Sequence, residues 1–188
     1  DCISMTGIVL PSSITKIGSG AFYGCVKLAG VTIPSSVNEI GEYAFYDCIR
    51  ISTVNVSDIV SWCNISFGNE YANPIYKANK LYIDGELATE IVLPNSVKRI
   101  GKYAFYNLTA MTTITLHNSV KTIDDYAFYG CSGLSTVYYV GTPAQYAAMT
   151  IGSYNEPFTR VTPIFIGGHT CTPGNTAELD RVDATCTE

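Results

Sequence analysis

The sequence predicts a solenoid, a chain wound into stacked coils, because one short motif recurs at a fixed spacing. The motif reads KIGSGAF at 16–22, EIGEYAF at 39–45, RIGKYAF at 99–105 and TIDDYAF at 122–128. Its phenylalanines Phe22 and Phe45 are 23 residues apart, as are Phe105 and Phe128. A period of this length is typical of solenoids, in which each coil buries its apolar side against its neighbours.

Composition agrees with a packed repeat domain and narrows the possible partners. Hydrophobic residues make up 47% of the 188 residues and charged residues 14%, which favours a folded core over disorder. The net charge is −5 and no basic cluster occurs, so nucleic acid and anionic membranes are poor partners. No apolar run reaches the roughly 20 residues of a membrane-spanning helix.

The start of the chain resembles the middle of a repeat. The first residues are Asp1-Cys2 without Met, and Cys2 precedes Cys25 by one repeat length. We therefore expect that the chain is cut from a longer array, with further repeats on its N-terminal side.

Each coil is predicted from one pattern, best seen at 28–48. The alternation of Val31 and Ile33 indicates a short strand with one buried face, and Pro34 ends it because proline cannot extend a ladder. A return leg starts at Ile40-Gly41, and Phe45 and Cys48 close the coil from the inside of one helical turn. Serines just after the strand are expected to bond turn backbone: Ser13, Ser36, Ser96 and Ser119.

The coils are grouped into a larger repeating unit of 83 residues. Residues 1–83 and 84–166 match, and each half contains two coils followed by an insert of a helix and a strand. The helices are expected to begin after the capping residues Asp58 and Thr142, the second followed by proline. The strands at 81–83 and 164–166 end the inserts.

Turn signals complete the sequence of elements. Asp84-Gly85 predicts a two-residue hairpin, and Gly167-Gly168 takes the equivalent place in the second half. The repeat is lost after residue 167, so we expect the solenoid to span 1–167. Residues 168–188 are polar and non-periodic, and we interpret them as a linker or the start of another module.

The pattern at 28–48, and its close copy at 105–131 with its flanks, resembles the BspA-like leucine-rich repeat family. The resemblance covers about residues 2–166. It implies a leucine-rich repeat solenoid, a curved right-handed coil with a parallel β-sheet on its inner face, in secreted or surface-attached bacterial proteins. Leu108 stands where other coils have cysteine, and His117 stands where they have proline.

Seven cysteines raise the question of disulfides or metal. Cys25, Cys48 and Cys131 share a register with Leu108, which marks an apolar core position, so we expect buried, reduced thiols. Cys63 aligns with Ala147 or Ala148 and is likewise assigned to packing. Outside the repeats, Cys171 and Cys186 are spaced too loosely for a zinc site with His169, and a disulfide between them is the better interpretation.

No motif for catalysis or cofactor binding is present. The adjacent carboxylates of Asp124 and Asp125 should diverge on a turn, and His117 is interpreted as a solvated turn residue. We therefore predict a protein without enzymatic activity, cofactor or metal.

Tyrosine supplies the candidate binding surface. The chain has 14 tyrosines, and four of them directly follow the core phenylalanine of a coil, so they should point outward in a ladder: Tyr23, Tyr46, Tyr106 and Tyr129. Exposed tyrosine with little charge nearby is typical of binding surfaces, although stacked tyrosines could simply shield the coil edge. A second candidate is the outward side of the inner sheet: Val9, Thr32, Asn55, Val92, Thr115 and Tyr138.

Two functions remain open at this point. The first is a binding or adhesion module of a secreted or surface-bound bacterial protein, with a host or microbial protein or a glycan as partner. The alternative is a rigid spacer within a large surface protein.

Overall fold

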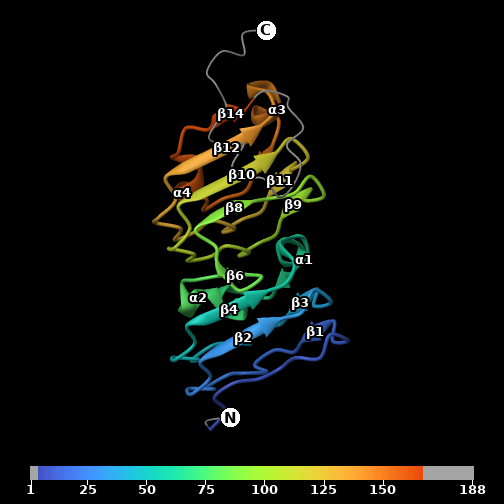
Figure 1. Cartoon of the computed structure of the whole chain (residues 1–188), viewed down its shortest axis with the longest axis vertical. Coiled ribbons are helices and arrows are strands. Elements are labelled where there is room, and N and C mark those ends of the chain that lie inside the picture. The colour runs from blue at the N-terminus through green and yellow to red at the C-terminus, as the bar shows by residue number, and fades with distance from the viewer. Residues whose placement is uncertain (1–3, 167–188) are drawn as a thin grey trace.

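The computed structural model describes residues 4–166, a stack of coils along the longest axis of the molecule (Figure 1). One line of strands forms two four-stranded sheets. The first sheet has the order β2 (Gly30–Ile33), β4 (Thr53–Val56), β6 (Tyr82–Ile83) and β7 (Glu86–Leu87). The second has the order β8 (Glu90–Val92), β10 (Thr113–His117), β12 (Thr136–Val140) and β14 (Ile164–Ile166).

A second line of two-residue strands follows the return legs of the coils. It consists of β1 (Lys16–Ile17), β3 (Glu39–Ile40) and β5 (Ser66–Phe67), and of β9 (Arg99–Ile100), β11 (Thr122–Ile123) and β13 (Thr150–Ile151). These strands were not predicted, because two residues are too few to show an alternating pattern. The named strands all pair in parallel except β6 and β7.

The register of the sheets follows the repeat length. Val31 pairs with Val54 and Ile33 with Val56, so residues 23 apart lie side by side and point into the core. Pro34 follows the end of β2, as predicted. At the equivalent place in β10, His117 extends the strand and pairs with Val140, because histidine keeps the N–H that proline lacks.

The segment that carries the core phenylalanine of each coil is a run of turns. The prediction that Phe45 and Cys48 share one helical turn is therefore wrong. Phe45 and Cys48 are both buried, and the Cys48 N–H donates to the Phe45 carbonyl at 3.3 Å. Tyr43 and Asp47, however, have left-handed backbone with φ of 57° and 59°, which a helix excludes.

The inserts contain the helices, which are short: α1 (Ile59–Asn64), η1 (Glu70–Ala72) and α2 (Ile75–Ala78), then α3 (Pro143–Ala147) and α4 (Glu156–Thr159). Both predicted caps are confirmed. Asp58 accepts from the Val60 and Ser61 N–H groups, and Thr142 forms a capping box with Gln145. The Asp84-Gly85 hairpin is also confirmed, with positive φ at both residues.

Both lines of strands are interrupted between the first insert and the coils that follow it. β7 does not pair with β8, and β5 does not pair with β9. A backbone bond from the Gly101 N–H to the Cys63 carbonyl at 2.8 Å bridges the gap, together with two side chains. The Trp62 indole donates to the Ala104 carbonyl at 2.8 Å, and the buried Asn73 amide donates to the Tyr103 carbonyl at 2.7 Å.

One hydrophobic core runs through the stack from Ile17 to Phe158, and the phenylalanines stack along it. Phe22 and Phe45 lie 5.0 Å apart, and Phe105, Phe128 and Phe158 continue the same arrangement. Ser36 and Ser119 donate to Ile14 and Val97 carbonyls of the preceding coil, which confirms their expected backbone contacts.

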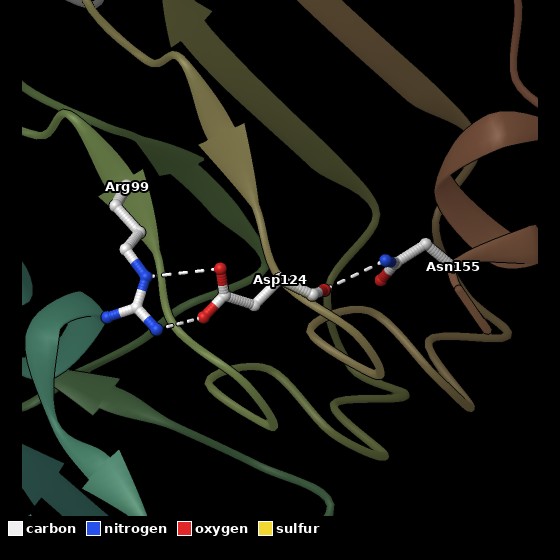
Figure 2. A network of polar contacts seen from close by, with 3 residues as sticks. All are labelled: Arg99, Asp124 and Asn155. Carbon is white, nitrogen blue, oxygen red and sulfur yellow. Dashed lines mark hydrogen bonds and ion pairs between the residues drawn. The ribbon is translucent and has the colours of Figure 1, made fainter. Parts of the chain in front are cut away.

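Polar side chains also tie neighbouring coils near the C-terminal end of the described residues. Figure 2 shows Asp124, which follows β11, paired through its carboxylate with Arg99 of β9 and through its carbonyl with the Asn155 amide at 2.9 Å. Asn155 is 2% exposed, and its side-chain oxygen accepts from the Phe128 N–H at 2.9 Å. In other coils a backbone carbonyl fills this place, as Ala44 does for Phe22.

Candidate binding surface

The four tyrosines that follow core phenylalanines lie outside the core, as predicted. Tyr23, Tyr46 and Tyr129 are exposed, whereas Tyr106 is half-buried. Neighbouring rings contact each other, with centroids 5.4 Å apart for Tyr23 and Tyr46 and 5.1 Å apart for Tyr106 and Tyr129.

Tyrosines of the first insert join these two pairs into one row. Tyr71 packs edge-on against Tyr46 at 4.9 Å and edge-on against Tyr76 at 4.9 Å. Tyr76 then reaches Tyr106 at 6.2 Å. The row therefore continues across the place where both lines of strands are interrupted.

A second row lies beside the first, three residues earlier in each coil. Tyr103 stacks on Tyr126 at 5.4 Å, and Tyr126 stacks on Tyr154 at 4.3 Å. Tyr43 stacks on Tyr71 at 5.7 Å. Contacts between Tyr43 and Tyr46, Tyr103 and Tyr106, and Tyr126 and Tyr129 connect the rows. We call the ten connected residues the tyrosine surface: Tyr23, Tyr43, Tyr46, Tyr71, Tyr76, Tyr103, Tyr106, Tyr126, Tyr129 and Tyr154.

The tyrosines of the second row have an unfavourable backbone conformation. Tyr43, Tyr103, Tyr126 and Tyr154 all have φ between 57° and 63°. The first coil has Gly20 at this register, with φ of 63°. Left-handed backbone costs a bulky residue about 1–2 kcal/mol, which glycine avoids. Strain of this kind is typical of positions where the side chain itself has a role.

Stacking determines which part of each ring meets solvent. Four neighbouring pairs stack, which covers the ring faces between them, whereas four other pairs meet edge to face. Exposure is greatest near the ends, at 46% for Tyr23 and 51% for Tyr154, whereas Tyr103 is only 8% exposed. Burial, followed by the charge of Glu70, raises the pKa of Tyr106 to about 12, so its hydroxyl keeps its proton at neutral pH.

Few charges lie against the tyrosine surface. The Lys102 ammonium is 5.0 Å from the centre of the Tyr103 ring and 5.8 Å from that of Tyr126. Glu70 raises the pKa of Tyr71, and Asp125 contributes to the raised pKa of Tyr126 after burial and Tyr154. Opposite charges are therefore mixed along the surface.

The second candidate surface, the outward side of the larger sheets, is only partly as predicted. Thr32 and Val92 are exposed, Val9 is 92% exposed, and Asn55 and Tyr138 are half-exposed. Thr32 and Asn55 line a shallow hollow beside β2 together with small neighbours such as Gly30.

The prediction that Thr115 belongs to this candidate surface is wrong, because the residue is 3% exposed and cannot contact a partner. It lies on the central strand β10, between Val92 and Tyr138 in register. Neighbours on both sides cover it, which explains its burial.

The prediction for His117 is also wrong. This residue is 8% exposed at the end of β10 and is not a solvated turn residue. Burial lowers its pKa, so it is neutral at physiological pH.

The cysteines of the repeats are core residues, as predicted. Cys25, Cys48, Cys63 and Cys131 are buried, and Cys48 and Cys131 donate to the carbonyls of Phe22 and Phe105. Burial raises the pKa of Cys63 and Cys131. The expected disulfide between Cys171 and Cys186 and the nearby His169 lie outside the described residues.

Within residues 4–166, no cluster of three or more histidine, cysteine or acidic side chains could hold a metal ion. In the same part of the chain, no helix is both long and apolar enough to cross a membrane.

Sequence reasoning missed six members of the tyrosine surface. Tyr43, Tyr103 and Tyr126 stand at one register of the motif, so their period was a usable signal. Tyr71, Tyr76 and Tyr154 lie in the inserts, outside the 23-residue motif, although the 83-residue offset relates Tyr71 to Tyr154.

Comparison with known proteins gives a family match over most of the chain. Residues 1–73 and 78–154 match, in six copies, the family described as BspA type Leucine rich repeat region. No curated protein matches the chain.

Several solved structures of bacterial leucine-rich repeat proteins are similar to this chain at low identity. One, from T. pallidum, is 21% identical with a TM-score of 0.41, over 78% of this chain and 73% of that one. A leucine-rich cell surface protein from Faecalibacterium prausnitzii is 18% identical with a TM-score of 0.38, over 78% of this chain and 35% of that one. A leucine-rich repeat protein from Bacteroides ovatus is 19% identical with a TM-score of 0.37, over 88% of this chain and 63% of that one.

Proposed function

The chain belongs to the BspA-type leucine-rich repeat family, and on that premise we propose that it is a non-catalytic module that binds another protein through the tyrosine surface. The family and its fold are generally non-enzymatic. The observation that carries the proposal is the unbroken contact among ten tyrosines along the stack, four of them on strained backbone.

The chemistry of this surface favours a protein over a glycan. Sugar rings bind aromatic residues mainly by stacking on the ring face, and several faces here are covered by a stacked neighbouring tyrosine. The outward edges and hydroxyls suit the mixed apolar and hydrogen-bonding contacts of a protein interface, where tyrosine is enriched. Tyrosine also buries a large area at low entropic cost.

We place this module in a secreted or surface-attached bacterial protein that adheres to a host or microbial surface protein. The family supports this location. Because positive and negative groups are mixed and sparse near the tyrosine surface, binding should depend only weakly on ionic strength.

The test is a screen of the protein against arrays of host matrix proteins, microbial surface proteins and glycans. A variant with serine at Tyr23, Tyr46, Tyr106 and Tyr129 should lose at least about 2 kcal/mol of binding free energy, roughly thirtyfold in affinity. The single substitution Tyr43→Gly should disturb the fold less, because Gly20 shows that the backbone accepts glycine at this register.

A matched control tests the other surface. The triple variant Tyr138→Ser, Thr32→Ala and Asn55→Ala changes the outward side of the larger sheets. It should leave the affinity for the ligand unchanged. A ligand that binds the parent and the tyrosine variants equally, or that is lost with the sheet-side variant, contradicts the assignment. A ligand that proves to be a glycan, or whose affinity collapses in moderate salt, contradicts the proposed partner chemistry.

A rigid spacer is the second candidate function. Its support is the single hydrophobic core that runs from Ile17 to Phe158, which couples the coils mechanically. The flanking gene sequence separates the two functions: a catalytic domain beyond the repeats favours a spacer, whereas repeats that continue to a surface anchor favour adhesion.

The proposed architecture of the whole chain follows the same repeats. We propose one right-handed, curved solenoid over residues 1–167, with super-repeats at 1–83 and 84–166, followed by a linker at 168–188. The order of helix, short strand, helix and returning strand in both inserts supports the larger unit.

A further inference from the structure

Tyr126 and Tyr154 are the most closely stacked tyrosines of the tyrosine surface. Their ring centroids are 4.3 Å apart and their planes differ by 9°, whereas the other tyrosine pairs described for residues 4–166 lie at 4.9 Å or more. The two residues follow β11 and β13, which pair in parallel. Their φ angles of 60° and 63° are nearly equal, so both rings project from the coil edge in the same way.

From this geometry we propose that Tyr126 and Tyr154 are a site of oxidative crosslinking, at which a haem peroxidase and hydrogen peroxide join the two rings as dityrosine. The site needs no binding partner and goes beyond the proposed function. It would attach the coil of β13 covalently to the coil of β11.

The reaction balances with peroxide as the only oxidant. Each phenol gives up one electron and one proton and becomes a phenoxyl radical. The two radicals form a carbon–carbon bond between the ring positions next to the hydroxyl-bearing carbons. Each joined carbon then loses its hydrogen as a proton, and each oxygen regains one. The two electrons and two protons released overall reduce one hydrogen peroxide to two waters.

Three features of the pair favour this reaction. Tyr154 is 51% exposed, so an oxidant can reach it. The stack holds the two rings within contact distance and nearly parallel, so two radicals formed there need no diffusion to meet. Tyr126 also contacts Tyr103 and Tyr129, so a radical formed on a neighbouring ring can pass to the pair by electron exchange.

The test treats the dilute full chain with horseradish peroxidase and limiting hydrogen peroxide. We expect the blue fluorescence of dityrosine, a protein that stays monomeric on a denaturing gel, and a mass lower by two hydrogen atoms. Peptide mass spectrometry should find the peptide of Tyr126 joined to that of Tyr154. Tyr154→Phe keeps the stacked ring but cannot form a phenoxyl radical, so the crosslink should be lost.

Tyr138→Phe is the matched control, because Tyr138 lies on β12 outside the tyrosine surface, and it should give the parental product. The proposal is overturned if Tyr154→Phe gives the parental crosslink, or if the joined peptides contain another pair such as Tyr106 and Tyr129. It is equally overturned if the product is mainly a dimer, or if none forms while free tyrosine added to the same tube is coupled.

Discussion

Single side chains in the core behave as parts of a stack. Phe45 is 3% exposed, and its ring lies 20° from parallel to that of Phe22. Its N–H donates to the Tyr71 carbonyl of the first insert at 3.1 Å, so the residue joins a coil to the insert that follows it. Removing the ring therefore opens a cavity between units that stabilise each other.

Phe45→Ala should lower the free energy of unfolding by about 3–5 kcal/mol, the usual cost of truncating a buried phenylalanine. Urea or thermal unfolding followed by circular dichroism measures the loss. Tyr46→Ala, at the exposed neighbouring position, is the control and should cost much less. A Phe45→Ala protein that melts within about two degrees of the parent would show that this phenylalanine is not a core residue.

The buried thiols should be inert in the folded protein. Cys25, Cys48 and Cys131 should not react with a thiol reagent at pH 8 until urea unfolds the chain, because only an accessible thiolate reacts. Labelling with and without urea, counted by mass spectrometry, checks this. A native disulfide at any of the three positions would contradict the core assignment.

Burial of Cys48 also predicts a dependence on pH. Desolvation raises its pKa from 9.0 to about 11, so between these values the folded state keeps a proton that the unfolded chain loses. This stabilisation is fully present below pH 9 and is lost as pH rises towards 11. Unfolding in urea at several pH values should show the loss, and it should be smaller in Cys48→Ala. Equal slopes in the two proteins would exclude this thiol as a cause.

At the level of elements, the second insert uses a side chain where the regular coils and the first insert use a backbone carbonyl. Where an ordinary coil presents a carbonyl to the phenylalanine N–H of its neighbour, the second insert presents the Asn155 side chain. The Asn155 amide also donates to the carbonyls of Asp124 and Gly152. One asparagine thus pairs with three backbone groups. The Asp124 carbonyl also accepts from the Ala127 N–H, so the Phe128 N–H and the Gly152 carbonyl depend most on this side chain.

Asn155→Ala should therefore destabilise the protein by about 1–3 kcal/mol for each group left buried and unpaired. Asn69→Ala is a matched control: its side chain also accepts from a backbone N–H, that of Tyr43, but at an exposed place where water can replace it. Equilibrium unfolding of both variants measures the difference. Equal losses would mean that water reaches the Asn155 site.

At the scale of the whole molecule, the stack is continuous in its core and discontinuous in its sheets. Neither line of strands crosses from the first insert to the coils that follow it. Continuity there depends on the buried side chains Trp62 and Asn73, which both bond backbone near Ala104, and on one backbone bond from Gly101 to Cys63. The cooperativity of the array should therefore be most vulnerable at this point.

We predict that Trp62→Ala divides one unfolding transition into two, because it removes both a large buried ring and the hydrogen bond to Ala104. Differential scanning calorimetry checks this. Trp62→Phe is the milder comparison, since it keeps most of the packing and should lower stability while a single transition remains. A single sharp transition in Trp62→Ala would show that the rest of the core is sufficient to couple the two parts.

The period, the core register, the helix caps and the hairpin of this protein can all be predicted from its sequence. These features depend on residues close in the chain: Val31 and Ile33 alternate, Thr142 caps the helix that it precedes, and Asp84-Gly85 closes its own turn. Repetition then multiplied each local signal, which made the family recognisable.

Which surface residues meet and which are covered depends on how distant segments of the chain pack together. Tyr71 and Tyr76 complete the tyrosine surface because the insert folds back beside the coils, and no local pattern gives that placement. Thr115 and His117 follow the outward pattern or the turn position of the repeat, yet both are buried by strands 23 or more residues away. The exposure of a residue depends on the neighbours that pack against it, whereas the repeat period can be read from the chain alone.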